Sequence, residues 1–134
     1  PAVLCRGGIT PDDGLNGRSH FFHYWRIEMS WLYLISAGLF EIGWPVGLKM
    51  AQNPGTRLTG IAVAVMFMGI SGVLLWLAQK NIPIGTAYAV WTSIGAVGTF
   101  AVGILFYGDA TSLARYLGVA LIIAGVVTLK LASH

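Results

Sequence analysis

The stretch Trp31–Leu48, WLYLISAGLFEIGWPVGL, decides the fold class, because it is apolar over the length of a membrane helix and holds one acidic residue, Glu41. About 18 consecutive apolar residues are enough to cross the hydrocarbon layer of a bilayer. A carboxylate at the centre of such a helix costs about 2.5–3.5 kcal/mol on insertion scales. The stretch contains no basic residue to pair with it. Glu41 therefore predicts a site for ions, protons or a charged substrate.

The composition of the whole chain also indicates a membrane protein. Only 10% of the 134 residues are charged and 56% are hydrophobic, whereas soluble domains average about 25% charged residues. The charge-free runs Leu58–Gln79 and Ile84–Gly108 are each long enough to span a bilayer. The shorter run Tyr116–Leu129 lies between Arg115 and Lys130, whose side chains can reach the two interfaces. We expect an all-α membrane protein with four transmembrane helices, at about residues 31–49, 58–79, 84–107 and 113–131.

Residues 1–28 differ in character from the rest, because they are polar and rich in glycine. Met29 would be a natural start for a membrane protein. We expect residues 1–28 to be a disordered or non-native N-terminal extension and residues 29–134 to form the membrane domain. The single cysteine, Cys5, leaves no disulfide within the chain, and no metal or cofactor pattern is present. Basic residues stand singly at span ends, which argues against nucleic-acid binding. The spans contain too few polar groups for an enzyme.

The basic residues at the span ends give little preference for one orientation in the membrane. Lys80 and Lys130 fall on one side, and Lys49, Arg57 and Arg115 fall on the other. The positive-inside rule therefore gives almost no bias. One preferred orientation set by other factors is one interpretation. The other is insertion in both orientations, so that two copies pair as an antiparallel dual-topology homodimer and reproduce the inverted repeat of larger transporters.

The residues around Glu41 in the sequence predict part of a binding site. Gly38, Glu41 and Trp44 are spaced by three and share a broad helix face. Pro45 has no N–H to donate to the carbonyl of Glu41, so it predicts either a packing kink or an extra acceptor at the same depth.

The second and third predicted helices add hydroxyls and rings. Ser71 lies in the middle of one, while Tyr88, Trp91 and Thr92 form an aromatic and hydroxyl wall on the other. A carboxylate flanked by such groups suits a small organic cation, through charge and cation–π attraction. Taken singly, each aromatic ring is more often lipid-facing or a packing residue, and Ser71 alone would be a helix–helix hydrogen bond. On the last helix, Gly118 and Gly125 are seven apart and predict a close helix contact between two copies.

Two segments carry a resemblance to a known family. AGLFEIGW, which contains Glu41, and PIGTAYAVWTSIGAVG in the third helix resemble the signatures of the small multidrug resistance family, as does the spacing of Gly118 and Gly125. The similarity covers essentially residues 29–134. Trp44 and Thr92 are similar to the guanidinium-exporter subtype. Ser93 departs from the family, which usually has glycine at this third-helix kink.

The resemblance implies a proton-coupled antiporter in the bacterial inner membrane that exports guanidinium or similar cations as an antiparallel homodimer. Its partners would be the cation, protons, membrane lipids and a second copy. The site would be lined by Glu41, Trp44, Ser71, Tyr88 and Trp91, with Gly38, Thr92 and Ser93 in support. Two alternatives remain open: export of larger quaternary ammonium cations, and a small membrane scaffold or assembly factor whose glutamate pairs with a partner helix.

Overall fold

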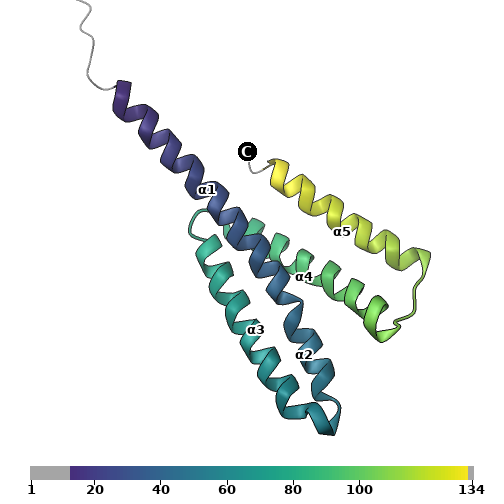
Figure 1. The fold of residues 1–134 in the computed structure, drawn as a ribbon. Helices are drawn as coiled ribbons and strands as arrows, with labels where there is room; N and C mark the ends of the chain where they lie inside the picture. The colour runs from purple at the N-terminus through teal and green to yellow at the C-terminus, as the bar shows by residue number, and fades with distance from the viewer. Residues whose placement is uncertain (1–12, 133–134) are drawn as a thin grey trace, which may run out of the picture.

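The computed structural model describes residues 13–132, with side chains from Arg18 onward, and this part of the chain is almost entirely helical. Figure 1 shows the elements in order: α1 (Asp13–Glu41), α2 (Gly43–Ala51), the 3₁₀ turn η1 (Pro54–Thr56), α3 (Arg57–Ala78), α4 (Ile84–Tyr107) and α5 (Leu113–Ala132). Within the described residues, four helical segments are long and apolar enough to cross a membrane: Arg18–Ala51, Pro54–Ala78, Ile84–Tyr107 and Leu113–Ala132.

The predicted helices 58–79, 84–107 and 113–131 correspond to α3, α4 and α5 within one residue at each end. Their boundaries follow from turn chemistry in the sequence. The side chain of Asn53 accepts a hydrogen bond from the backbone N–H of Gly55 at 3.4 Å, which closes the turn between α2 and α3. Helix α4 ends at Gly108, whose φ of 66° is left-handed and suits a residue without Cβ.

The first predicted helix, residues 31–49, differs from the structure at two points. Helix α1 begins at Asp13, so the expected extension is helical from that residue on, while residues 1–12 lie outside the described residues. The helix is also not continuous, because Ile42 separates α1 from α2. Pro45 explains the interruption, since its ring clashes with the carbonyl of Glu41 and its nitrogen has no hydrogen to donate to that carbonyl.

Helices α2 and α3 pack with their backbones in contact. A Cβ added at Gly47 would lie 2.6 Å from the backbone nitrogen of Ala64. A Cβ added at Gly60 would lie 2.4 Å from the backbone nitrogen of Ala51. Glycine at both positions therefore allows α3 to pass close to the α1–α2 segment, and this approach sets the distance between Glu41 and the middle of α3.

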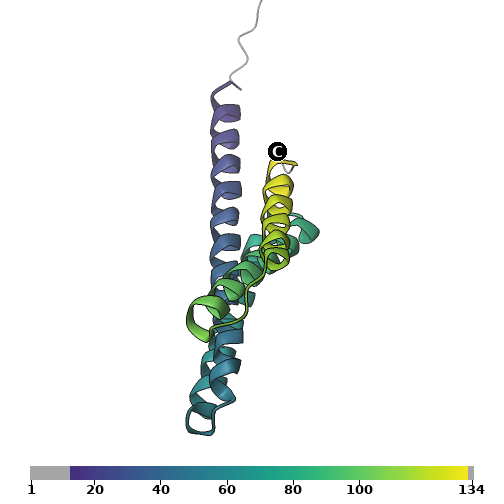
Figure 2. The same ribbon diagram turned by 90° about the vertical axis from the view of Figure 1, so that its right-hand side faces the viewer.

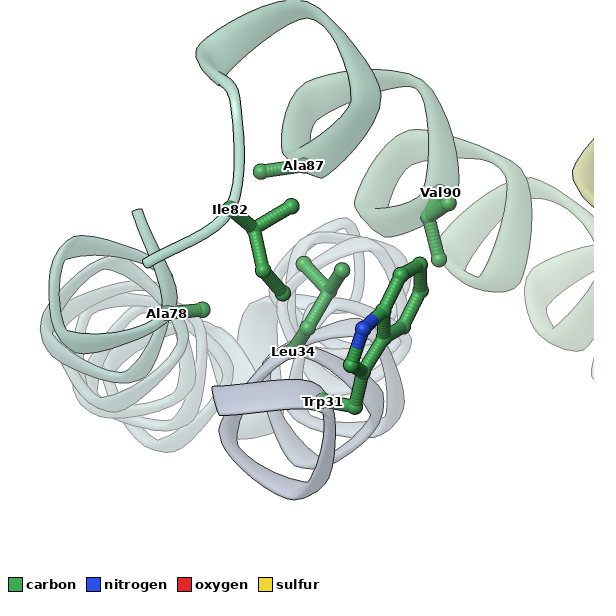
Figure 3. Packing of buried hydrophobic residues seen from close by; sticks show 6 residues of the cluster. All are labelled: Trp31, Leu34, Ala78, Ile82, Ala87 and Val90. Carbon is green, nitrogen blue, oxygen red and sulfur yellow. The ribbon is translucent and has the colours of Figure 1, made fainter. Parts of the chain in front are cut away.

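The buried apolar residues gather where α1, α4 and the connection between α3 and α4 meet. Figure 3 shows that the side chains of Trp31 and Leu34 on α1 face Ile82 in this connection and Val90 on α4. Leu34 is completely buried. This cluster fixes α4 against α1 on the N-terminal side of Glu41.

Helix α5 is attached differently from the others. It packs against α4, where the rings of Phe100 and Tyr116 meet edge to face at 6.1 Å. At its far end, the Lys130 ammonium lies 5.4 Å from the centre of the Trp31 ring. None of its residues is buried. Figure 1 shows α5 running back beside α4, away from α3, so one side of the helix is open.

Candidate functional site

Glu41 is the last residue of α1, at the point where Pro45 interrupts the helix. The chain turns there through a hydrogen bond from the Ile42 N–H to the carbonyl of Leu39, at 3.2 Å. The Glu41 side chain is half-buried. The break therefore places an ionisable group in the middle of the membrane segment, where the backbone is less regular than in a continuous helix.

Two neutral donors from different helices hold the carboxylate. The indole N–H of Trp44 donates to Oε1 of Glu41 at 2.6 Å, one turn further along the chain. The hydroxyl of Ser71, which is completely buried on α3, lies 3.1 Å from Oε2. Hydrogen bonds to an ionised acceptor are shorter and stronger than neutral ones. Because both donors are neutral, they orient the carboxylate without cancelling its charge.

Ser71 also links the carboxylate to α4 and to the backbone of α1. Its Oγ accepts a hydrogen bond from the indole N–H of Trp91 at 2.9 Å, and it lies 2.8 Å from the carbonyl oxygen of Ala37. A hydroxyl has a single hydrogen, so Ser71 donates either to Glu41 or to Ala37 at one time. The serine therefore has two alternative acceptors, and the charge of Glu41 influences which one it uses.

The space beside the carboxylate is a cavity of about 310 Å³ between α1, α2 and α4. Its lining residues include one acidic and no basic side chain, and they are Glu41, Trp44, Pro45, Thr92, Gly95, Ala96, Thr99 and Phe100. Gly95 is required by the close approach of α4, because a Cβ there would lie 2.6 Å from Cγ of Glu41. The cavity thus offers a carboxylate, two aromatic rings and threonine hydroxyls, which together suit a small organic cation.

The basic residues near the spans lie at the helix ends. Lys49 lies 5.8 Å from the centre of the Tyr107 ring, Lys80 lies 4.3 Å from that of Trp76, and Lys130 lies near Trp31. These contacts keep the ammonium groups at the two membrane interfaces, where aromatic rings are also favoured.

Comparison with known proteins identifies the family of this chain. The family model described as Small Multidrug Resistance protein matches residues 29–122. A protein named guanidinium exporter from Salmonella typhimurium (strain LT2) is 49% identical over 106 residues, which cover 79% of this chain and 100% of the relative. One of the same name from Yersinia pseudotuberculosis is 50% identical over 105 residues, covering 78% of this chain and 100% of the relative. The chain belongs to the Small Multidrug Resistance protein family. With its four spans, it is a multi-pass membrane protein of that family.

In this family member, four of the predicted site residues form one hydrogen-bonded group: Glu41, Trp44, Ser71 and Trp91. Tyr88 joins the group through Trp91, with ring centres 5.3 Å apart and planes tilted by 55°. More than half of the Tyr88 side chain, 56%, is exposed in the single chain. The structure thus places together residues from four helices, α1, α2, α3 and α4.

The supporting residues divide between two places. Thr92 lines the Glu41 cavity, while its hydroxyl donates to the carbonyl of Tyr88 at 2.7 Å. Ser93 lines a separate apolar groove of about 330 Å³ against α5, and its hydroxyl donates to the carbonyl of Ala89 at 2.5 Å. At this position the Ser93 hydroxyl contacts its own helix and does not line the Glu41 cavity. Such back-bonding often bends a helix. Gly38 is buried against Ile94.

Sequence reasoning missed several residues of the site. Gly95, Thr99 and Phe100 line the cavity, and the carbonyl of Ala37 competes for the Ser71 hydroxyl. The one available signal was a glycine inside an apolar helix, which indicates a close approach without saying to what. Gly118 and Gly125 have no atom within 4 Å of an added Cβ in the single chain, so their role as a dimer contact stays a prediction.

Proposed function

We propose that this chain exports guanidinium, or a similar small guanidinyl cation, across the bacterial inner membrane in exchange for protons. The observation that carries the proposal is the Glu41 carboxylate, which two neutral donors orient toward a cavity without basic lining residues. Relatives that are 47–50% identical and aligned over their full length are named guanidinium exporters, which supports this substrate. The proposed activity is transport, with no catalytic group assigned.

Guanidinium fits the chemistry of the cavity. It is planar and presents paired N–H donors that match the two oxygens of a carboxylate. Trp44 and Phe100 also line the cavity and provide ring faces for cation–π contact. The cavity volume of about 310 Å³ leaves room for a small cation and some water, or for a modest substituent on the guanidinyl group.

Proton coupling follows from competition at one carboxylate. When Glu41 is ionised, it binds the cation and Ser71 donates to it. When Glu41 is protonated, its own O–H donates to the oxygen of Ser71, and the serine hydrogen turns to the carbonyl of Ala37, which lies 2.8 Å away. Each state satisfies the polar atoms, and the cation and the proton exclude each other. Alternate binding from the two sides then links their fluxes.

The functional unit in this proposal is an antiparallel dual-topology homodimer. A single chain leaves the Glu41 cavity open, and α5 exposes its small-residue stripe with Gly118 and Gly125. A second, inverted copy would close the cavity and bring a second Glu41 to the same depth. Inverted repeats around a midplane site are the common architecture of secondary transporters.

The test is flux through purified protein in proteoliposomes. A guanidinium gradient should drive proton movement with the native chain and should not do so with Glu41→Gln, which keeps the shape of the side chain and removes its charge. Glu28→Gln on the same helix is the matched control, because Glu28 is exposed and lies outside the cavity. Tetramethylammonium run in parallel separates guanidinium export from quaternary ammonium export. Guanidinium-driven proton flux that persists in Glu41→Gln would falsify the proposal.

A further inference from the structure

The segment formed by helices α1 and α2 is too long to lie entirely within a membrane. From Asp13 to Ala51 the helical path measures about 58 Å at about 1.5 Å per residue, whereas the hydrocarbon layer is about 30 Å thick. Figures 1 and 2 both show the first part of α1 extending beyond the ends of the other helices. The contacts of Lys80 with Trp76 and of Lys130 with Trp31 place the interface on this side near Trp31. The turns of α1 just before Ser30 therefore lie at headgroup level.

A groove of about 540 Å³ lies at this level, between α1 and the end of α3. On α1 its lining residues recur once per helical turn and so share one face: Phe22, then Trp25 and Arg26, then Met29 and Ser30, then Tyr33. Lys80 and Asn81 line the opposite side. The side-chain amide of Asn81 donates to the Ser30 hydroxyl at 2.8 Å, and this hydroxyl donates to the carbonyl of Arg26 at 2.9 Å. These bonds fix the two sides of the groove relative to each other.

The groove is positively charged. Arg26 and Lys80 contribute to its lining, and none of its lining residues is acidic. Glu28 is two residues from Arg26, about 200° around the helix, and does not line the groove. Arg26 also lies outside residues 29–122, the part that matches the family model. The groove is therefore built partly by a segment of this chain that the family match does not include.

We propose that this groove binds the headgroup of an anionic phospholipid. The guanidinium of Arg26 would contact the phosphate, and the ammonium of Lys80 would turn to it from the Trp76 ring, whose centre lies 4.3 Å away. Trp25 and Tyr33 would lie against the glycerol and the upper acyl chain. Basic pockets between membrane helices at headgroup level are a recurring form of lipid site, and amphipathic rings favour the same depth. The groove does not include Glu41, so this proposal does not depend on the proposed transport function.

The experiment measures lipid affinity on the purified full chain in detergent by native mass spectrometry, with phosphatidylglycerol and phosphatidylcholine as the two probes. We expect phosphatidylglycerol to bind at least about tenfold more tightly. Arg26→Gln and Lys80→Gln should each weaken its binding about fivefold, the effect of removing one cation at a charged membrane surface. Arg18→Gln is the matched control, because it removes the same charge from the same helix but lies outside the groove.

Further measurements distinguish a bound lipid from a soluble anion and from a second copy of the chain. Helical content by circular dichroism should be unchanged in Arg26→Gln and Lys80→Gln, which shows that both variants fold. Equal affinity for the two lipids, or an equal loss in Arg18→Gln, would overturn the proposal. Displacement of the lipid by millimolar inorganic phosphate would assign the groove to a soluble anion instead. Loss of the dimer in Arg26→Gln would assign it to a second copy. Either result also overturns the lipid site.

Discussion

Helices α1 and α5 are both apolar enough to span a membrane, yet they differ in what surrounds them. Helix α1 contributes Trp31, Leu34 and Ala37 to the buried part of the chain and ends at Glu41. Helix α5 has no buried residue at all. In a bilayer, lipid tails are as apolar as leucine, so an exposed apolar face carries no hydrophobic penalty. Within one chain, α1 buries residues and carries the site, whereas α5 leaves its apolar side exposed, where a second copy could pack.

The largest expected loss of guanidinium affinity comes from disturbing the closest contact of α1 with α4. Gly95→Val puts a side chain where a Cβ alone lies 2.6 Å from Cγ of Glu41. The carboxylate must move away from Trp44 and Ser71, and we expect guanidinium affinity, measured by isothermal titration calorimetry, to fall about a hundredfold, toward the upper end of overpacking costs. Gly69→Val is the control, because no atom lies within 4 Å of an added Cβ there. Equal losses in both variants would show that the contact is unimportant.

Lowering the pH should weaken guanidinium binding at Glu41, the last residue of α1. In the proposed exchange a proton and guanidinium exclude each other at Glu41, so guanidinium affinity should weaken several-fold as the pH falls, by about 1 kcal/mol or more. Helix α5 carries no acidic side chain and no histidine. The dimer fraction, followed by energy transfer between labelled copies from pH 5 to 8, is the control: a loss of guanidinium affinity at a constant dimer fraction assigns the effect to the site. A guanidinium affinity independent of pH would contradict competition at Glu41.

The predicted dimer contact of α5 is tested by larger side chains at Gly118 and Gly125. In the single chain no atom lies within 4 Å of a Cβ added at Gly118 or at Gly125, so a chain carrying both Gly118→Leu and Gly125→Leu should keep its helical content by circular dichroism. If the stripe faces a second copy, the added side chains separate the helices, and we expect dimerisation in detergent to weaken about fivefold. Ala120→Leu is the matched control, because residue 120 lies about 200° around the helix from Gly118. Unchanged dimerisation in the double variant would place the interface elsewhere.

The same comparison explains which features the sequence could predict. The bounds of α3, α4 and α5 follow from long apolar runs interrupted by turn residues such as Asn53 and Gly108, and both signals are local. The start of α1 does not follow from composition. Extending a helix that has already formed costs much less than starting one, so polar residues before Met29 continue the helix although alone they would not form one.

The site divides in a similar way. Glu41 was predictable because a lone charge at membrane depth is unusual. Trp44, Ser71 and Trp91 were predictable only in combination with Glu41 and through the resemblance to the family signatures. The roles of Gly95 and of the Ala37 carbonyl could not be predicted, because each depends on an atom from another helix. Gly95 lies against Cγ of Glu41, and the Ala37 carbonyl lies against Oγ of Ser71. Such approaches arise only when α3 and α4 pack against α1, and residue type does not encode them locally.

The smallest expected loss of guanidinium affinity comes from removing a single hydrogen bond to Glu41. Trp44→Phe keeps an aromatic ring beside the carboxylate but removes the N–H that lies 2.6 Å from Oε1 of Glu41. Trp44 is half-buried, so water can replace part of the lost interaction, and we expect guanidinium affinity to fall only about threefold. Trp76→Phe is the matched control, because Trp76 contacts Lys80 at the interface and does not line the cavity. A larger loss in Trp44→Phe than in Gly95→Val would mean that this one donor, rather than the fit of α4 against α1, determines the affinity of the site.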